Sequence, residues 1–414
     1  MAIVNVLAPT QPAVKQLIWG QAAPCGRATA GSVGYTSVGA DPAGALPCPC
    51  ACGSIRARLA KSYATTLVHA STNPYNAIPL MAENGSDDFG PSCEEHGRRY
   101  GIDRGGSYLL PIDGTERERL DVMHTMLKTA RDSNAKLLHA PTTSLEPGTV
   151  ALTGRRPRVM DLACGTGIWL LEMAETYPHA EFHGYDINRM APLHLLPNIE
   201  IHCPVDIEQP WTGIPRDWDI IHLQLGLGAV KDWGSIYSRV RKHLKPGTGW
   251  FEGVEIDWQP RSNDGTLRPD SKLVRWWNEI AMRYQWLGYP INYSNTTAQA
   301  LEKAKFREIQ SREYMIPLSG WNTRSNRLHR SGIWCNIAMS AGVDRNFGLE
   351  AMSLRPITRV GPWPVEHIRR FCREAMAEAS DSNIHAYFKL HYYYEKESFG
   401  RLQSYPEANR EFRS

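Results

Sequence analysis

A glycine-containing turn that follows a carboxylate is the part of this chain best suited to bind a cofactor. Residues 158 to 162 are expected to form an apolar strand, which leads through Asp161-Leu-Ala-Cys-Gly-Thr-Gly167 into an amphipathic helix. Gly165 and Gly167 let the backbone approach a ligand closely, and the first turn of the helix presents unpaired N–H groups. The spacing therefore predicts a nucleotide-cofactor loop between strand and helix.

The residues around this loop favour S-adenosylmethionine over a dinucleotide. A dinucleotide fingerprint has a third small residue three positions after the second glycine, where this chain has Leu170. Asp161 repels a pyrophosphate but suits a ligand with a cationic amino-acid group. An NAD-dependent oxidoreductase is therefore disfavoured.

A second carboxylate is expected at the end of the next strand, over residues 181 to 186. Asp186 suits the two hydroxyls of an adenosine ribose, a feature shared with NAD enzymes, and Ile187 follows it at the cofactor. After a third strand over 199 to 203, Asp206 and Ile207 are expected toward the adenine. The alternative is a glycine turn in an ordinary α/β domain without a cofactor.

Composition limits the class of protein. The chain has 414 residues and a net charge of +3, with no Lys/Arg block that tracks a phosphate backbone. It also lacks a run of about 18 apolar residues, the length needed to span a membrane. Nine cysteines without a secretory leader favour a reducing compartment over a disulfide framework. Neither direct nucleic-acid binding nor a membrane partner is predicted.

No metal site is predicted. Cys48, Cys50 and Cys52 alternate without the paired spacing of a zinc knuckle and without a nearby histidine, so a low-complexity loop is favoured over zinc. Cys164, inside the cofactor loop, is interpreted as a small filler because no His-Asp pair is identifiable to activate it.

One elaborated domain is expected between two tails. Residues 1–92 are rich in small residues and are predicted to be disordered; a mitochondrial transit peptide is the minority interpretation of their acid-poor composition. The domain covers 93–398, and residues 399–414 form a C-terminal tail. The expected parts of the domain are a lid and helix at 93–150, a cofactor-binding core at 155–260, and helical cap insertions at 261–305 and 319–382.

Alternating strands and helices predict an α/β fold with a doubly wound, mostly parallel, seven-stranded sheet. Strands are expected near 158–162, 181–186, 199–203, 218–224, 249–257, 306–318 and 384–395. Helices are expected over 115–131, 271–287, 297–305, 323–341 and 364–380, the first beginning with Thr115 and Glu118 as a capping box. The aromatic helix 271–287, with Trp276 and Trp277, and its successor are interpreted either as walls of an acceptor pocket or as plain core.

This strand order, together with Asp161, Gly165, Gly167 and Asp186, resembles class I S-adenosylmethionine-dependent methyltransferases over residues 155 to 260. The usual loop has glycine where this chain has Ala163, a departure that is tolerable if the backbone there avoids the left-handed region. A narrower likeness, from 93 to 398, is to the LaeA-like methyltransferases of filamentous fungi. The segments that carry it are Gly97-Arg-Arg-Tyr100, Tyr108-Leu-Leu-Pro-Ile-Asp113, Trp218-Asp-Ile-Ile-His-Leu-Gln224 and Trp250-Phe-Glu-Gly-Val-Glu-Ile-Asp257.

The resemblance implies S-adenosyl-L-methionine as cofactor and a methyltransferase that acts in or regulates fungal secondary metabolism. Family regulators are nuclear and partner with velvet-domain proteins, so the nucleus or cytoplasm is the expected location. A small-molecule O- or N-methyltransferase without a regulatory role, and a non-catalytic regulator with the same fold, remain alternatives. The acceptor, a small molecule or a protein, is left open. The segment Tyr100-Gly-Ile-Asp-Arg-Gly-Gly106 departs from the regulator pattern and favours a paralogue.

Two residues are candidate catalytic groups. His222 lies just inside the end of the fourth strand, and imidazole titrates near neutral pH, which suits a base for a phenol-like acceptor. The alternative is a packed strand residue that makes one hydrogen bond. Glu255, with Asp257, is expected at the end of the fifth strand as an acceptor-side acid, or else as a solvated strand end.

The methionine end of the cofactor is expected to meet Gln224 and a lid. Gln224 ends the fourth strand and faces the crevice where such sheets bind ligands. Arg98, Tyr100 and Tyr108 are expected in the lid, with Arg98 pairing the cofactor carboxylate and a tyrosine packing on the sulfonium.

Overall fold

The computed structural model describes six stretches of the chain: residues 90–102, 108–131, 137–192, 195–293, 296–340 and 347–396. All of them belong to one compact unit, Leu80–Ser414. The predicted tails, apart from residues 90–92, lie outside these stretches, as do Cys48, Cys50 and Cys52.

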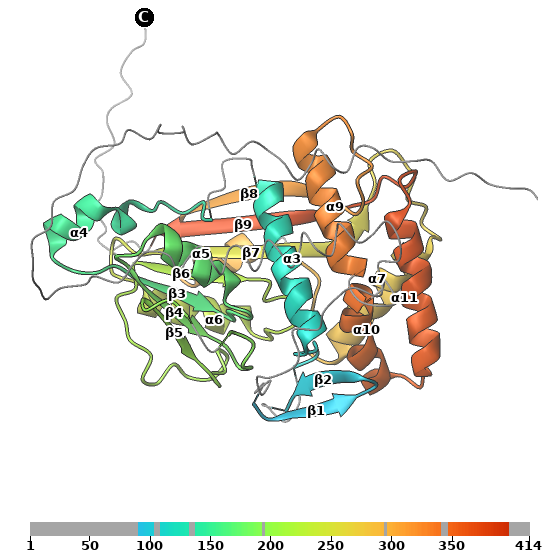
Figure 1. Ribbon diagram of the computed structural model, residues 1–414, viewed down its shortest axis with the longest axis horizontal. Helices are drawn as coiled ribbons and strands as arrows, with labels where there is room; N and C mark the ends of the chain where they lie inside the picture. Colours follow the sequence, from blue (N-terminus) through green and yellow to red (C-terminus); the bar gives the residue numbers. More distant parts are fainter. Residues whose placement is uncertain are drawn as a thin grey trace, which may run out of the picture. The chain divides into compact units, whose positions relative to one another are not determined.

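A seven-stranded sheet in the order β5-β4-β3-β6-β7-β9-β8 forms the centre of the fold (Figure 1). Five strands run parallel, and β9 pairs antiparallel with both of its neighbours. The prediction of a doubly wound, mostly parallel sheet is confirmed. The strands are β3 (Arg158–Leu162), β4 (Glu181–Tyr185), β5 (Ile199–His202), β6 (Ile220–Gln224), β7 (Trp250–Arg261), β8 (Arg307–Pro317) and β9 (Tyr387–Lys396).

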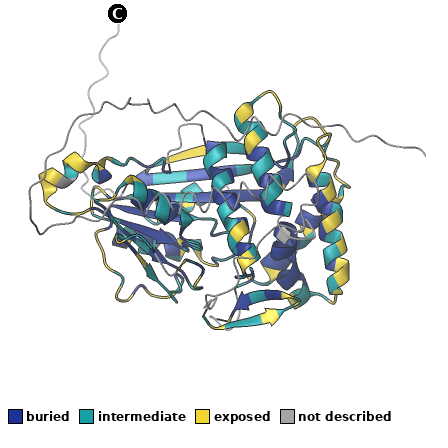
Figure 2. Ribbon diagram, in the orientation of Figure 1, coloured by how far each residue is buried: buried dark blue, intermediate teal, exposed yellow. Residues whose placement is uncertain are grey.

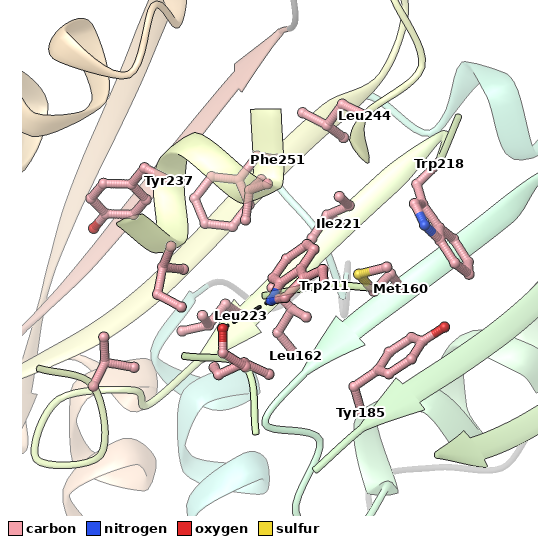
Figure 3. Close-up of a cluster of buried hydrophobic side chains, with 14 of the residues drawn as sticks. Met160, Leu162, Tyr185, Trp211, Trp218, Ile221, Leu223, Tyr237, Leu244 and Phe251 are labelled. Atoms are coloured by element: carbon pink, nitrogen blue, oxygen red, sulfur yellow. Dashed lines mark hydrogen bonds between the residues drawn. The ribbon is translucent and has the colours of Figure 1, made fainter. Parts of the chain in front are cut away.

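Helices cover both faces of the sheet because its strands are apolar on both sides. On one face, α5 (Ile168–Thr176) packs through Trp169 and Leu170 on Phe182. On the other face, Met160 and Leu162 meet α6 (Trp233–His243) and α8 (Thr297–Lys303), in the cluster that Figure 3 shows. The strand order reverses between β3 and β6, which is where such folds bind ligands.

The remaining elements surround the sheet and its C-terminal strands. Helix α3 packs along α9, and α10 contacts α7 and α11 near the hairpin of β1 and β2 (Figure 1). Helices α3, α9 and α11 carry both buried and exposed residues, whereas α10 is buried over most of its length (Figure 2). The bounds are β1 (Ser92–Glu95), β2 (Arg98–Gly101), α3 (Gly114–Arg131), η4 (Thr143–Leu145), α4 (Pro147–Thr153), α7 (Lys272–Trp286), α9 (Asn326–Ser340), α10 (Phe347–Val360) and α11 (Val365–Ser380).

Several details differ from the sequence prediction. The hairpin and α10 were not predicted; α10 contains Pro356, which in a sequence normally indicates a helix end. Helix α8 was expected in the cap, but its Leu301 lies in the core cluster beside α6. Helix α3 is capped by Asp113, whose carboxylate accepts the Glu116 N–H at 3.0 Å, and not by the predicted Thr115 capping box.

Two general properties follow from the described residues. No helix in them is long and apolar enough to cross a membrane. Their cysteines, Cys93, Cys164, Cys203, Cys335 and Cys372, are all free thiols.

Candidate cofactor site and its surroundings

A cavity opens at the carboxyl ends of β3, β4 and β6, beside the reversal of strand order. Asp161, Asp186 and Gln224 line it from these strand ends, and Ile187 follows in its wall. The empty space between these side chains, counted together with the part open to solvent, is about 1290 Å³. The sequence analysis predicted these four residues at one site, and the fold brings them together.

The glycine turn forms part of the cavity wall in a left-handed conformation. Gly165 and Gly167 have φ of 54° and 73°, a region open to glycine. Ala163 has φ of 53°, so the condition under which its replacement of glycine was tolerable is not met. A left-handed residue other than glycine costs about 1–2 kcal/mol. The alanine in this loop is therefore a strained position.

Asp186 connects the turn to the end of β4. Its carboxylate accepts the N–H groups of Gly165 and Asn188, each at 2.8 Å. Burial raises the pKa of Asp186 to about 6, although these N–H donors favour the ionised form. The carboxylate is thus fixed in place on the cavity wall before any ligand binds.

Asp161 forms a buried pair with His222. Oδ1 of Asp161 lies 2.8 Å from Nδ1 of His222, whose ring stacks on Trp169 at 3.9 Å between centroids. Burial raises the pKa of Asp161, and the hydrogen bond to His222 opposes this effect. His222 is fully buried and is not among the residues that line the cavity. The expectation of a catalytic base is therefore corrected: His222 is the packed strand residue of the alternative and orients Asp161.

Of the two residues expected toward the adenine, one lines the cavity and the other does not. Val205 and Ile207 line the cavity, whereas Asp206 does not. The Asp206 carboxylate instead accepts the Glu208 N–H at 2.8 Å and lies 3.4 Å from the side-chain amide of Gln209. This end of the cavity is therefore apolar, and Asp206 shapes the turn behind it.

Comparison with known proteins identifies the family. A model described as a methyltransferase domain matches residues 112–305. Secondary metabolism regulator LAE1 of Cochliobolus heterostrophus is 37% identical over 319 residues, which cover 76% of this chain and 96% of the relative. The chain belongs to the LaeA-like methyltransferases. Secondary metabolism regulator laeA of Aspergillus flavus is 36% identical, covering 74% of this chain and 78% of the relative. A relative from Emericella nidulans, named protein-methionine methyltransferase laeA, is 36% identical, covering 72% and 75%.

The lid of this LaeA-like chain uses different residues from those predicted. Tyr108 lines the cavity, as expected. Arg98 does not: its guanidinium donates to Asp113 at 2.7 and 3.0 Å, so it holds the residue that caps α3. The cation that does line the cavity is Arg119, paired with Glu116 at 2.8 Å. Arg119 lies on the inner face of the helix that was predicted over 115–131, but helical spacing alone does not mark it as a cavity residue.

Tyr100 belongs to a clamp behind the lid. It is fully buried, with the Arg355 guanidinium 4.2 Å from its ring centroid. Arg355 also donates to Glu95 at 2.6 Å and to the Tyr108 carbonyl at 2.7 Å. A residue of α10 thereby fixes the hairpin and the segment that carries Tyr108.

Glu255 acts on the cavity through a loop. Its two carboxylate oxygens accept the N–H groups of Gly226 and Leu227 at 2.8 and 3.1 Å, and burial raises its pKa to about 8. Glu255 is not among the residues that line the cavity, and Asp257, also outside the lining, bonds to Arg261 at 2.7 Å. The expectation of Glu255 as a catalytic acid is corrected, because its carboxylate fastens the loop after β6.

The cap and the far end of β7 form another part of the cavity wall. Trp258, Tyr284, Ile291 and Met352 line it there. Trp276 and Trp277 are buried in the core instead, with Trp276 Nε1 bonded to Ser353 Oγ at 2.8 Å. Of the aromatic helix, Tyr284 thus lines the cavity, whereas Trp276 and Trp277 belong to the core.

Three methionines in the cavity wall were missed by sequence reasoning. Met123 lies on α3, Met190 follows β4, and Met352 lies on α10. No motif marks them, and one is on a helix that was not predicted. The Met123 sulfur accepts a hydrogen bond from Arg119 at 2.7 Å.

Proposed function

We propose that this chain binds S-adenosylmethionine in the cavity and transfers its methyl group to a methionine thioether of a protein. The observation that carries the proposal is the combination of two fixed carboxylates, Asp161 and Asp186, with a cavity wall that contains neither of the two predicted catalytic residues, His222 and Glu255. The relative named protein-methionine methyltransferase supports the choice of acceptor.

The charges of the cavity suit this cofactor. Asp161 attracts a cationic amino group, and Asp186 accepts from ribose hydroxyls. Among the described residues of the wall, Arg119 is the only cationic side chain, and Glu116 neutralises it. A pyrophosphate finds no counter-charge here, so a dinucleotide is a poor fit.

A thioether acceptor explains why neither predicted catalytic residue has to line the cavity. Bound S-adenosylmethionine supplies an electrophilic methyl group, and a thioether sulfur accepts it as the old C–S bond breaks, becoming a sulfonium without releasing a proton. The chain therefore needs no base and serves by aligning the two sulfurs and excluding water. Tyr284 and Trp258 are aromatic residues of the cavity wall, and aromatic rings favour a nearby cation such as the sulfonium.

The regulatory part of the proposal rests on the relatives named as secondary metabolism regulators. We extend this regulatory role to the present chain and propose that its methyl transfer regulates fungal secondary metabolism. A velvet-domain partner and a nuclear location remain expectations of the resemblance.

Incubation with deuteriomethyl-labelled S-adenosylmethionine tests the proposal. The purified chain is incubated alone and with fungal protein extract, and peptides are analysed by mass spectrometry. The expected result is label on methionine sulfur, absent with Asp186→Asn. Met190→Leu and Met352→Leu test whether the chain modifies itself, with Met123→Leu as the matched control because its sulfur is already hydrogen bonded.

The alternatives give different results. Label only in the small-molecule fraction would favour a biosynthetic methyltransferase. Cofactor binding without any transfer would favour a non-catalytic regulator.

A further inference from the structure

Two histidines and a glutamate on the neighbouring strands β4 and β5 form a cluster outside the cofactor site. The parallel register pairs His183 with Glu200 and Tyr185 with His202. Since alternate residues of a strand point to the same face, these side chains share one face of the sheet. It is the face that carries Tyr185 and Trp218 in Figure 3.

The donor atoms of the cluster are close enough to share one ion. Nδ1 of His183 lies 3.0 Å from Nε2 of His202. The Glu200 carboxylate has Oε2 3.6 Å from His183 Nδ1 and Oε1 3.8 Å from His202 Nδ1. Two nitrogens that each bind a tetrahedral zinc ion at about 2.0–2.1 Å are roughly 3.4 Å apart. Small rotations of the rings therefore suffice.

The surroundings hold the rings and leave an approach from solvent. His202 stacks on Tyr185 at 4.5 Å, and His183 meets the edge of Trp218 at 5.0 Å. The side chains of His183, His202 and Glu200 are 19%, 29% and 64% exposed. An ion can reach this position, and water can complete its coordination.

We propose that His183, Glu200 and His202 bind a divalent transition-metal ion of the zinc type. In the metal-free protein one imidazole donates its N–H to the other. When the ion binds, the donor ring carries its proton on the other nitrogen, so that each neutral ring coordinates through a lone pair. Two imidazoles and one carboxylate form a ligand set that suits zinc. The sequence predicted no metal because the pairing of two strands, not a local spacing, assembles this set.

The ion cross-links the edge strand β5 to β4 close to the cofactor cavity. The His202 carbonyl accepts the Asp186 N–H at 3.2 Å, and the Asp186 carbonyl accepts the Val205 N–H at 2.7 Å. Asp186 and Val205 both line the cavity. The expected effect of the metal is a more stable strand edge, independent of the identity of the methyl acceptor.

Calorimetric titration of ZnCl₂ into the chelator-stripped full chain tests the site. Cys48, Cys50 and Cys52 are replaced by serine in every variant, which removes their thiolates from competition. One equivalent of zinc is expected to bind. Glu200→Gln and His202→Ala are expected to weaken affinity by about 10-fold or more, because even residues behind the ligands contribute roughly 10–100-fold. His367→Ala, an exposed histidine on α11, is the matched control and is expected to leave affinity unchanged.

Two further measurements distinguish loss of this metal site from unfolding of the variants and from zinc binding by other residues. Zinc should raise the melting temperature of the parent and of His367→Ala but not of the cluster variants, and Glu200 is exposed enough that its variant folds. Bound Co²⁺ should show the spectrum of nitrogen and oxygen ligands. Unchanged zinc affinity in Glu200→Gln and His202→Ala, or thiolate charge-transfer bands with cobalt, would overturn the proposal.

Discussion

Asp161 and His222 form a hydrogen-bonded pair on neighbouring parallel strands, with Oδ1 and Nδ1 2.8 Å apart beneath Trp169. The pair lies at the reversal of strand order, where Asp161 faces the cavity and His222 does not. The histidine therefore determines where the carboxylate points.

Replacing His222 with phenylalanine should weaken cofactor binding and stability together. The ring can still stack on Trp169, but Asp161 loses its partner, and an unsatisfied buried group costs about 1–3 kcal/mol. Urea unfolding and calorimetric titration of S-adenosylmethionine measure the two effects. Normal affinity and stability combined with lost transfer and an altered pH profile would instead restore His222 as a base.

Cofactor affinity should increase with pH through the titration of Asp186. Its pKa is raised to about 6 from 3.8 in the folded protein, and ribose hydroxyls bind the ionised form. The stability contributed by this group has the opposite sign: it is complete below the unfolded pKa and is lost as pH rises through about 6. Titrations between about pH 5 and 8 should show the affinity change in the parent.

Asp186→Asn should bind the cofactor weakly and without this pH dependence. Asp121→Asn is the matched control, because burial also raises the pKa of Asp121 to about 6, while that residue bonds to Thr166 and is not in the cavity wall. If the pH dependence disappeared in Asp121→Asn and persisted in Asp186→Asn, the titrating group would be Asp121, and the prediction for Asp186 would be wrong.

Ala163→Gly should be tolerated, and Ala163→Val should not. Glycine removes the left-handed strain of about 1–2 kcal/mol but costs about 0.5–1 kcal/mol in chain entropy. The free energy of unfolding should therefore stay the same or increase by up to about 1.5 kcal/mol. A β-branched residue at this φ is an outlier, so valine should destabilise the loop and weaken cofactor binding. Equal stability of the two variants would contradict the assigned backbone.

Glu255→Gln should change cofactor affinity more than the rate of transfer. The amide keeps only one acceptor for the Gly226 and Leu227 N–H groups, so the loop that carries the cavity residues Leu225 and Leu227 loosens. An increase in KM for the cofactor with little change in kcat is expected. A fall in kcat of about 10²-fold or more at unchanged KM would indicate a catalytic acid or base.

The same substitution should flatten the pH dependence of stability. The pKa of Glu255 is raised from 4.5 to about 8, so the folded protein holds this proton more tightly than the unfolded chain. Its contribution to stability is complete below about pH 4.5 and is lost as pH rises through about 8. Denaturant midpoints across this range, compared with the parent, measure the difference.

The sequence by itself determined the cofactor loop and most of the sheet. Strand β3, the glycine turn and α5 are signalled by apolar periodicity and by residues next to one another in the chain, so local chemistry specifies them. Asp161, Asp186 and Gln224 follow from strand ends for the same reason. The LaeA-like resemblance extended this reading to the family.

Only the tertiary structure decided what the remaining side chains do. His222, Glu255 and Arg98 have residue types that suit catalysis or binding, but each is bonded to a group from another element: Asp161, the loop after β6, and Asp113. The histidine cluster likewise exists only because β5 pairs with β4. Which neighbour satisfies a buried polar group depends on strand register and helix packing, and neither can be read from the spacing of residues along the chain.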